Sequence, residues 1–158
     1  MSKLQLSENK VLKLKNTLIK TVDFTDENED LNLVVEKMQS FIKVKGAMQI
    51  GPLIQYIRTF INSEGELGME IKILLQCNNY IHSVEYPYTM ESVLRVPNCM
   101  YCRYTGPEDK LSFAYDKIRL EAFEKDISLK NENYTIFVDR DDENEKIIAD
   151  VFMERTDL

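Results

Sequence analysis

The sequence has 158 residues, of which 44% are hydrophobic and 30% are charged. This length suits one compact domain over residues 1–158, and the composition excludes a largely disordered chain. The formal net charge of −7 disfavours nucleic acid as a direct partner, because binding to a phosphate backbone requires Lys and Arg to displace counterions.

The N-terminal residues lack an apolar signal segment, and no apolar run approaches the length of a membrane span, so a cytoplasmic protein without membrane contact is expected. The three cysteines are an odd number, which favours reduced thiols over a disulfide framework. Cys99 and Cys102 have the spacing of a metal motif, but an offset of three on a strand places side chains on opposite faces. No metal and no cofactor are therefore predicted.

The first half of the chain predicts a strand, a helix and a hairpin. Residues 11–22 alternate as in a strand, with a bulge at 15–16. The polar run 25–30 supplies helix-capping groups, so a helix is expected to begin near Asp30 and to end at Gly46. Residues 50–57 and 69–75 then read as two strands joined by a hairpin loop.

The second half repeats this order after a connector over residues 78–97. Residues 99–104 predict a strand, and Thr105 and Glu108 match a capping box at the start of a second helix that ends around Asp126. Residues 134–138 and 147–153 predict a final hairpin. Large apolar side chains at helical spacing are expected in the core and not in a site: Met38, Phe41, Phe113, Tyr115 and Phe123.

The order strand, helix, strand, strand thus occurs twice, in residues 11–77 and in residues 98–154. This repetition predicts an α+β fold built from two pseudo-symmetric repeats. The repeats are expected to form a sheet with a groove between them and with the helices on the other face. A groove between related halves is a natural place for a ligand.

Four short motifs in this order resemble a GyrI-like domain, the fold of the effector-binding domain of AraC- and MerR-type multidrug regulators. They are Ile50-Gly51-Pro52, Tyr104-Thr105-Gly106-Pro107, Phe113-Ala114-Tyr115 and Glu132-Asn133-Tyr134. The resemblance covers about residues 11–154, and its specificity lies in the order and spacing of the motifs.

The resemblance implies a pocket lined by aromatic side chains, with a buried acid facing lipophilic ligands, cationic ones included. Glu132 is the matching acid, and strand alternation places Tyr134 on the same face. The equivalent strand of the first repeat and the connector supply the other candidates: Ile54, Tyr56, Tyr80 and Tyr86.

Each candidate also has an ordinary structural explanation. Glu132 could be a solvated residue at a strand start, and Tyr56 and Tyr134 could be core tyrosines whose hydroxyls reach water. Tyr80 and Tyr86 could close over the groove as a lid or simply pack within their loop.

The leading functional hypothesis is a stand-alone small-molecule-binding protein, serving as an effector sensor in bacterial transcription regulation. A helix-turn-helix is not expected, because about ten residues precede the first predicted strand. No catalytic residue is assigned, and binding is favoured over catalysis. One alternative is a small-molecule hydrolase that uses Glu132 with Tyr134, because some stand-alone GyrI-like proteins that this chain resembles are described as hydrolases. The other is a gyrase-inhibitor-like module that binds a protein partner.

Overall fold

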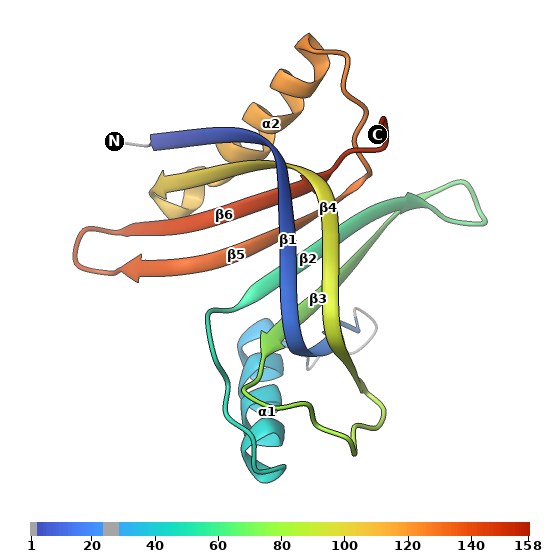
Figure 1. Cartoon of the computed structure of the whole chain (residues 1–158), viewed down its shortest axis with the longest axis vertical. Helices are drawn as coiled ribbons and strands as arrows, with labels where there is room; N and C mark the ends of the chain where they lie inside the picture. The colour runs from blue at the N-terminus through green and yellow to red at the C-terminus, as the bar shows by residue number, and fades with distance from the viewer. Residues whose placement is uncertain (1–2, 24–28) are drawn as a thin grey trace. The chain divides into compact units, whose positions relative to one another are not determined.

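A computed structural model describes residues 3–23 and 29–158 and shows two α-helices and a short 3-10 helix among antiparallel strands (Figure 1). The fold is α+β, and the order strand, helix, strand, strand occurs twice, as predicted. In chain order the elements are β1 (Lys3–Thr21), α1 (Leu31–Val44), β2 (Ile54–Ile61), β3 (Leu67–Gln76), β4 (Tyr88–Gly106), η1 (Glu108–Lys110), α2 (Ser112–Glu124), β5 (Glu132–Asp141) and β6 (Lys146–Glu154).

The chain divides into two compact units. The N-unit is Lys13–Leu94, and the C-unit combines Arg95–Leu158 with the residues up to Leu12. The long strands β1 and β4, blue and yellow in Figure 1, are therefore each divided between the two units, with one part in the N-unit and the other in the C-unit. A single domain over residues 1–158 stays a prediction.

The N-unit contains a sheet in the order β1–β3–β2, and α1 covers one of its faces. β3 pairs antiparallel with β2, in a register that sets Ile54 against Leu74, and with the last part of β1. The helix buries one side chain per turn because its apolar residues recur at intervals of four. Buried residues packed between helix and sheet include Val34, Met38, Ile42, Leu18, Ile73 and Leu75.

The C-unit repeats this arrangement with a sheet in the order β4–β6–β5 and with α2 on one face. β6 pairs antiparallel with β4 and with β5, so Phe152 lies beside both Tyr101 and Tyr134 in register. Alternate residues of these strands face the helix. The buried core between helix and sheet contains Met100, Cys102, Tyr104, Ala114, Ile118, Ala122, Ile147, Ala149, Val151 and Met153.

The predicted ends of α1 are confirmed. The side chain of Asp30 caps the helix by accepting a hydrogen bond from the backbone N–H of Asn32 at 2.9 Å. Gly46 follows the helix with φ +77°, the left-handed conformation that glycine adopts without steric cost. Residues 25–28 of the predicted capping run lie outside the described residues.

The capping box predicted at the second helix is wrong. Thr105 belongs to β4 and pairs with Ile148, so it is held in the sheet and cannot cap a helix. Pro107 then opens the 3-10 turn η1, and α2 begins only at Ser112, with no side-chain cap on Leu111. The pattern matched because Thr and Glu stood at the right spacing, but the strand extends one residue past the proposed cap.

The strands differ from the predicted bounds in three places. β1 begins at Lys3 and not near residue 11, and β4 begins at Tyr88, inside the predicted connector 78–97. Residues 50–52 precede β2 and do not open it. The predicted bulge in β1 agrees with the positive φ of Asn16, at 48°.

The core assignment of the helix side chains holds for Met38, which is fully buried, but it is wrong for Phe113 and Phe123. Their exposed fractions are 50% and 81%, because they lie off the stripe of buried residues on α2. Among the described helices, none has the length and apolar character needed to cross a bilayer.

The two units have the same backbone hydrogen bonds at one corner of their sheets. In the N-unit the N–H of Ile50 donates to the carbonyl of Gln76 at 2.8 Å, and in the C-unit the N–H of Lys130 donates to the carbonyl of Glu154 at 2.9 Å. A second matching bond joins Cys77 N–H to the Asn16 carbonyl, and Arg155 N–H to the Asn98 carbonyl. Equivalent positions in the two units can therefore be compared residue by residue.

Candidate functional site

A row of three aromatic rings crosses the C-unit sheet. Tyr101 of β4, Phe152 of β6 and Tyr134 of β5 are neighbours in register, and the ring centroids of Tyr101 and Phe152 are 5.0 Å apart. Strand alternation directs these rings away from the face that packs against α2. We call this set the aromatic row.

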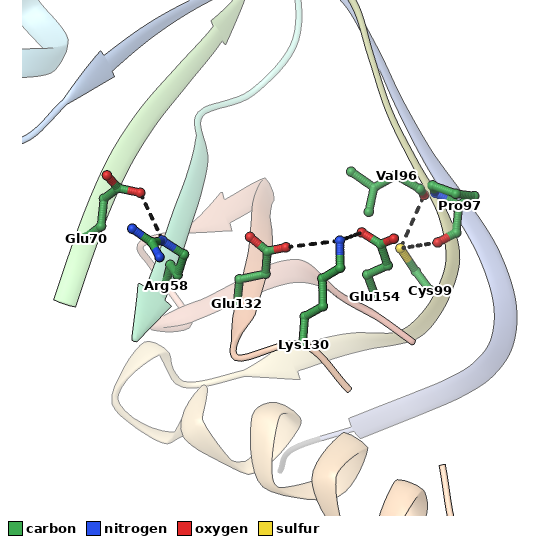
Figure 2. A network of polar contacts seen from close by, with 8 residues as sticks. All are labelled: Arg58, Glu70, Val96, Pro97, Cys99, Lys130, Glu132 and Glu154. Atoms are coloured by element: carbon green, nitrogen blue, oxygen red, sulfur yellow. Dashed lines mark hydrogen bonds and ion pairs between the residues drawn. The ribbon is translucent and has the colours of Figure 1, made fainter. Parts of the chain in front are cut away.

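Two carboxylates and one ammonium group lie next to the aromatic row, at the ends of β5 and β6. Lys130 Nζ donates a hydrogen bond to Glu154 Oε1 at 2.9 Å and lies 3.8 Å from Glu132 Oε1. Figure 2 shows the ammonium group between the two carboxylates. The carboxylate side chains are 18% and 20% exposed, against 44% for the lysine. We call Lys130, Glu132 and Glu154 the acid corner.

Tyr134 links the aromatic row to the acid corner. Burial, reinforced by the negative charges of Glu132 and Glu154, raises the pKa of Tyr134 to about 12. Its phenol is therefore protonated at neutral pH and can donate a hydrogen bond to a ligand.

Cys99 borders the acid corner but is fully buried. Its Sγ lies 3.3 Å from the carbonyl oxygen of Val96 (Figure 2). Burial first, and the charge of Glu154 second, raise the pKa of the Cys99 thiol to about 11. Cys102 lies on the α2 face, so the two thiols are directed to opposite faces, as expected. Across residues 3–23 and 29–158, no cluster of three or more His, Cys, Asp or Glu side chains is placed to hold a metal ion.

An ion pair fixes the other side of the aromatic row. The guanidinium of Arg103 donates to both oxygens of Asp150, Nε at 2.8 Å and Nη2 at 2.9 Å, and the hydroxyl of Tyr101 donates to Asp150 Oδ1 at 2.8 Å. Burial first, and the hydrogen bond to Asp150 second, raise the pKa of Tyr101 to about 12. A bidentate pair of this kind holds the Tyr101 ring in place.

The N-unit builds the equivalent corner without charges and without rings. Its backbone bond from position 50 to position 76 matches that from 130 to 154, and its strand pairs match those of the aromatic row. At the positions of the acid corner, Lys130, Glu132 and Glu154, the N-unit has Ile50, Pro52 and Gln76. At the positions of the aromatic row, Tyr101, Phe152 and Tyr134, it has Ile19, Leu74 and Ile54. The fold therefore does not require the acid corner or the aromatic row.

Of the residues predicted for the site, the structure brings Glu132 and Tyr134 together on one face of the C-unit. Ile54 and Tyr56 lie on β2 of the N-unit, where Ile54 is fully buried and Tyr56 is 7% exposed. The ammonium group of Lys72 lies 5.4 Å from the centre of the Tyr56 ring.

The other two predicted residues lie between β3 and β4 of the N-unit. Tyr80 is partly exposed and contacts His82, with ring centroids 5.0 Å apart. Tyr86 is almost fully exposed. Figure 2 also includes an ion pair of the N-unit, in which Arg58 Nε lies 3.3 Å from Glu70 Oε1.

Sequence reasoning missed four residues of this face: Tyr101, Lys130, Phe152 and Glu154. The signal for Tyr101 was its alternation with Cys99 in a predicted strand. The signal for Phe152 and Glu154 was the predicted hairpin, whose register sets Phe152 beside Tyr134. A register shift between Phe137 and Asp139 hides this pairing when the strands are simply counted back from their turn.

Comparison by sequence matches no family model and no curated protein. Comparison by structure matches the C-terminal domain of EcmrR, with a TM-score of 0.65 and 14% identity over 100% of this chain and 99% of that domain. It also matches EcmrR in a DNA complex, with a TM-score of 0.66 and 15% identity over 98% of this chain and 58% of the EcmrR chain. A hydrolase encoded by lin2189 from Listeria innocua matches with a TM-score of 0.53 and 10% identity over 98% of this chain and 92% of that one.

At these identities the likeness establishes the fold alone. The chain spans little more than half of the EcmrR chain in the DNA complex and nearly all of the isolated C-terminal domain. The arrangement of this chain is consistent with the GyrI-like fold expected from its sequence, and it is the fold of the EcmrR C-terminal domain.

Proposed function

We propose that this chain is a small-molecule-binding protein that takes lipophilic ligands, cationic ones in particular, on the aromatic row and at the acid corner of the C-unit. Effector sensing in bacterial transcription regulation is the role we propose for such binding. The GyrI-like resemblance of the sequence supports this class of ligand.

The chemistry of the face suits a flat or bulky apolar cation. An aromatic ring attracts a cation placed over its face by about 0.5–2 kcal/mol. Two partly buried carboxylates, Glu132 and Glu154, share one ammonium group, so the three charges sum to −1. A partly desolvated negative charge favours a positive partner, and the rings beside it favour an apolar one.

One observation supports the proposal above the others, namely the contrast between the two units. If the acid corner and the aromatic row served only to stabilise the fold, the N-unit would need similar groups at its matching corner. It holds Ile50, Pro52 and Gln76 there, and its backbone hydrogen bonds are the same. We infer that the charges and rings of the C-unit serve a ligand.

Titration with rhodamine 6G, a fluorescent lipophilic cation, tests this proposal. Saturable binding is expected for the wild type, and Glu132→Gln should weaken it by roughly 5- to 30-fold because the loss of one charge-assisted contact costs about 1–2 kcal/mol. Tyr134→Ala should weaken it by a similar factor through the loss of a ring face.

Glu108→Gln is the matched control. Glu108 also pairs with a cationic side chain in the C-unit, Arg140 at 2.8 Å, but it lies before α2 and away from the aromatic row. Its substitution should leave the dissociation constant unchanged. Equal effects of Glu108→Gln and Glu132→Gln would mean that only the overall charge matters, and the proposed site would be wrong.

The four candidates of the N-unit are tested by the same titration. Ile54, Tyr56, Tyr80 and Tyr86 stay predicted ligand contacts, and each alanine variant that weakens dye binding as Tyr134→Ala does would add its residue to the site. Variants at Tyr80 and Tyr86 are the cleaner tests, because these side chains are at least partly exposed and their loss leaves no core cavity.

A further inference from the structure

Lys130 occupies the position at the acid corner that a cationic ligand would need. Its ammonium group contacts Glu154 Oε1 at 2.9 Å and lies 3.8 Å from Glu132 Oε1, so it neutralises part of the charge of both carboxylates. The hydrogen bond to Glu154 raises the pKa of Lys130 above its ordinary value, so this group is positively charged at neutral pH. The chain thus supplies its own cation.

The burial of the three side chains shows which of them can move. The two carboxylates are each about one-fifth exposed, whereas the lysine is nearly half exposed. A lysine side chain has four rotatable bonds, and a partly exposed ion pair contributes little to stability. The ammonium group can therefore leave the carboxylates at small cost.

The backbone keeps Lys130 near the corner even when its side chain leaves. The N–H of Lys130 donates to the carbonyl of Glu154 at 2.9 Å, a bond that the N-unit repeats with Ile50 and Gln76. Because Ile50 provides the same backbone bond without a charge, the ammonium group of Lys130 is not needed to close the corner.

We propose that Lys130 is an internal competitor that sets the specificity of the site, and that a cationic ligand binds by displacing its ammonium group from Glu132 and Glu154. This inference rests on the proposed function and adds a selection rule to it. A small hydrophilic cation gains little over Lys130, which already satisfies the carboxylates. A lipophilic cation gains the aromatic row as well, so it outcompetes the lysine.

The test compares the affinities of Lys130→Met for two dyes. Rhodamine 6G is cationic, and Nile red is a neutral aromatic lipophile. Removal of the competing ammonium group should tighten rhodamine 6G binding by about two- to fivefold, the upper part of the range expected for one partly exposed ion pair. Nile red binding should change by less than about twofold, because a neutral ligand does not require displacement of the lysine.

The chain offers a closely matched control in Lys125. This lysine also lies between two glutamates of the C-unit, at 3.1 Å from Glu121 and 3.3 Å from Glu8, with a similar exposed fraction. Lys125→Met removes the same charge from the same unit at a different place, so it should leave rhodamine 6G binding unchanged. Lys130→Arg keeps the cation and should bind the dye as the wild type does.

Chemical labelling of the unmodified protein gives a second measurement that does not depend on how a variant folds. Acetylation of Lys130, followed by mass spectrometry, should become faster when rhodamine 6G saturates the protein, because release from Glu154 exposes the amine and lowers its pKa. Nile red should not change the rate, and Lys125 should react at the same rate with either dye.

The outcomes separate this inference from the proposed function. If the wild type binds rhodamine 6G and Lys130→Met binds it equally or more weakly, while Lys130 labelling does not rise, the competitor role is wrong although the binding function stands. If only Lys130→Met binds the dye, Lys130 is the occupant of the corner but the wild type is not a receptor for this cation. If neither binds, both proposals fail.

Discussion

At the scale of single residues, Cys99 shows that the candidate site favours the neutral form of a buried thiol. The thiol is fully buried beside Glu154, and the two effects together raise its pKa to about 11 from an ordinary value near 9. A protonated, inaccessible thiol is a poor nucleophile. Cys99 therefore acts as a small apolar wall of the acid corner.

The raised pKa predicts how stability depends on pH. Between about pH 9 and pH 11 the folded protein keeps the Cys99 proton that the unfolded chain loses, so the free energy of unfolding falls as the pH rises through this window. Below pH 9 the thiol is protonated in both states, and its contribution is complete.

Urea denaturation at pH 8 and at pH 10.5 measures this effect in the wild type and in Cys99→Ala. The variant loses packing equally at both pH values, so it should be less stable than the wild type at pH 8 and should lose less stability on going to pH 10.5. Parallel losses in the two proteins would show that the folded state does not hold this proton.

At the scale of elements, the two helices end in the same way with different residues. The N–H of Ala47 donates to the carbonyl of Ile42 at 3.1 Å, and the N–H of Ile127 donates to that of Ala122 at 2.8 Å, the bond that closes a Schellman motif. The residue in the left-handed conformation is Gly46 after α1, with φ +77°, and Asp126 after α2, with φ +54°.

This difference predicts a stabilising substitution. Asp126 is exposed, and its Cβ makes the left-handed conformation costly, so Asp126→Gly should raise the free energy of unfolding by about 0.5–1 kcal/mol. The reverse change in the other unit, Gly46→Ala, should lower it by about 1 kcal/mol or more. Chemical denaturation of both variants checks the pair, and a destabilised Asp126→Gly would show that the aspartate contributes a contact that outweighs the strain.

The sequence predicted those elements whose signals are local. The stripe on α1, its cap at Asp30 and its stop at Gly46 lie within one segment, and so do the hairpins around residues 62–66 and 142–145. The first part of β1 and the start of β4 have weaker alternation, and Pro97 within β4 argues against a central strand. These segments become strands through partners distant in the chain, which no local pattern reveals.

The same limit applied to the candidate site. Glu132 was predicted from the GyrI-like resemblance, and Tyr134 was predicted because strand alternation places it on the same face. Lys130 and Glu154 are 24 residues apart and meet only through the register of β5 and β6, which a bulge shifts. The resemblance therefore predicted the first carboxylate of the acid corner, and no local pattern predicted its partner carboxylate or its counter-ion.

At the scale of the whole molecule, the C-unit depends on a segment from the far end of the chain. Leu6 packs against the core beneath α2, Glu8 pairs with Lys125 at 3.3 Å, and Asn9 Oδ1 accepts from Arg155 Nη1 at 3.2 Å. The backbone of Leu12 also lies beside the thiol of Cys99, where it lowers the pKa of that thiol. The first part of β1 thus supports the acid corner, although more than 85 residues separate it from Cys99 in the chain.

Removal of the residues up to Leu12 should therefore damage the C-unit, which is remote in sequence, more than the N-unit, which follows directly. Hydrogen exchange is expected to accelerate in residues 95–106 and in α2, because the truncation uncovers Leu6's neighbours in the core and breaks the contacts to Lys125 and Arg155. Exchange in α1 and β3, which belong to the N-unit, should change much less.

Rhodamine 6G binding should weaken along with the C-unit, since the truncation removes the Leu12 contact to Cys99 beside the acid corner. Faster exchange confined to residues 13–94 would contradict this assignment of β1 and would place the support of the acid corner elsewhere in the chain.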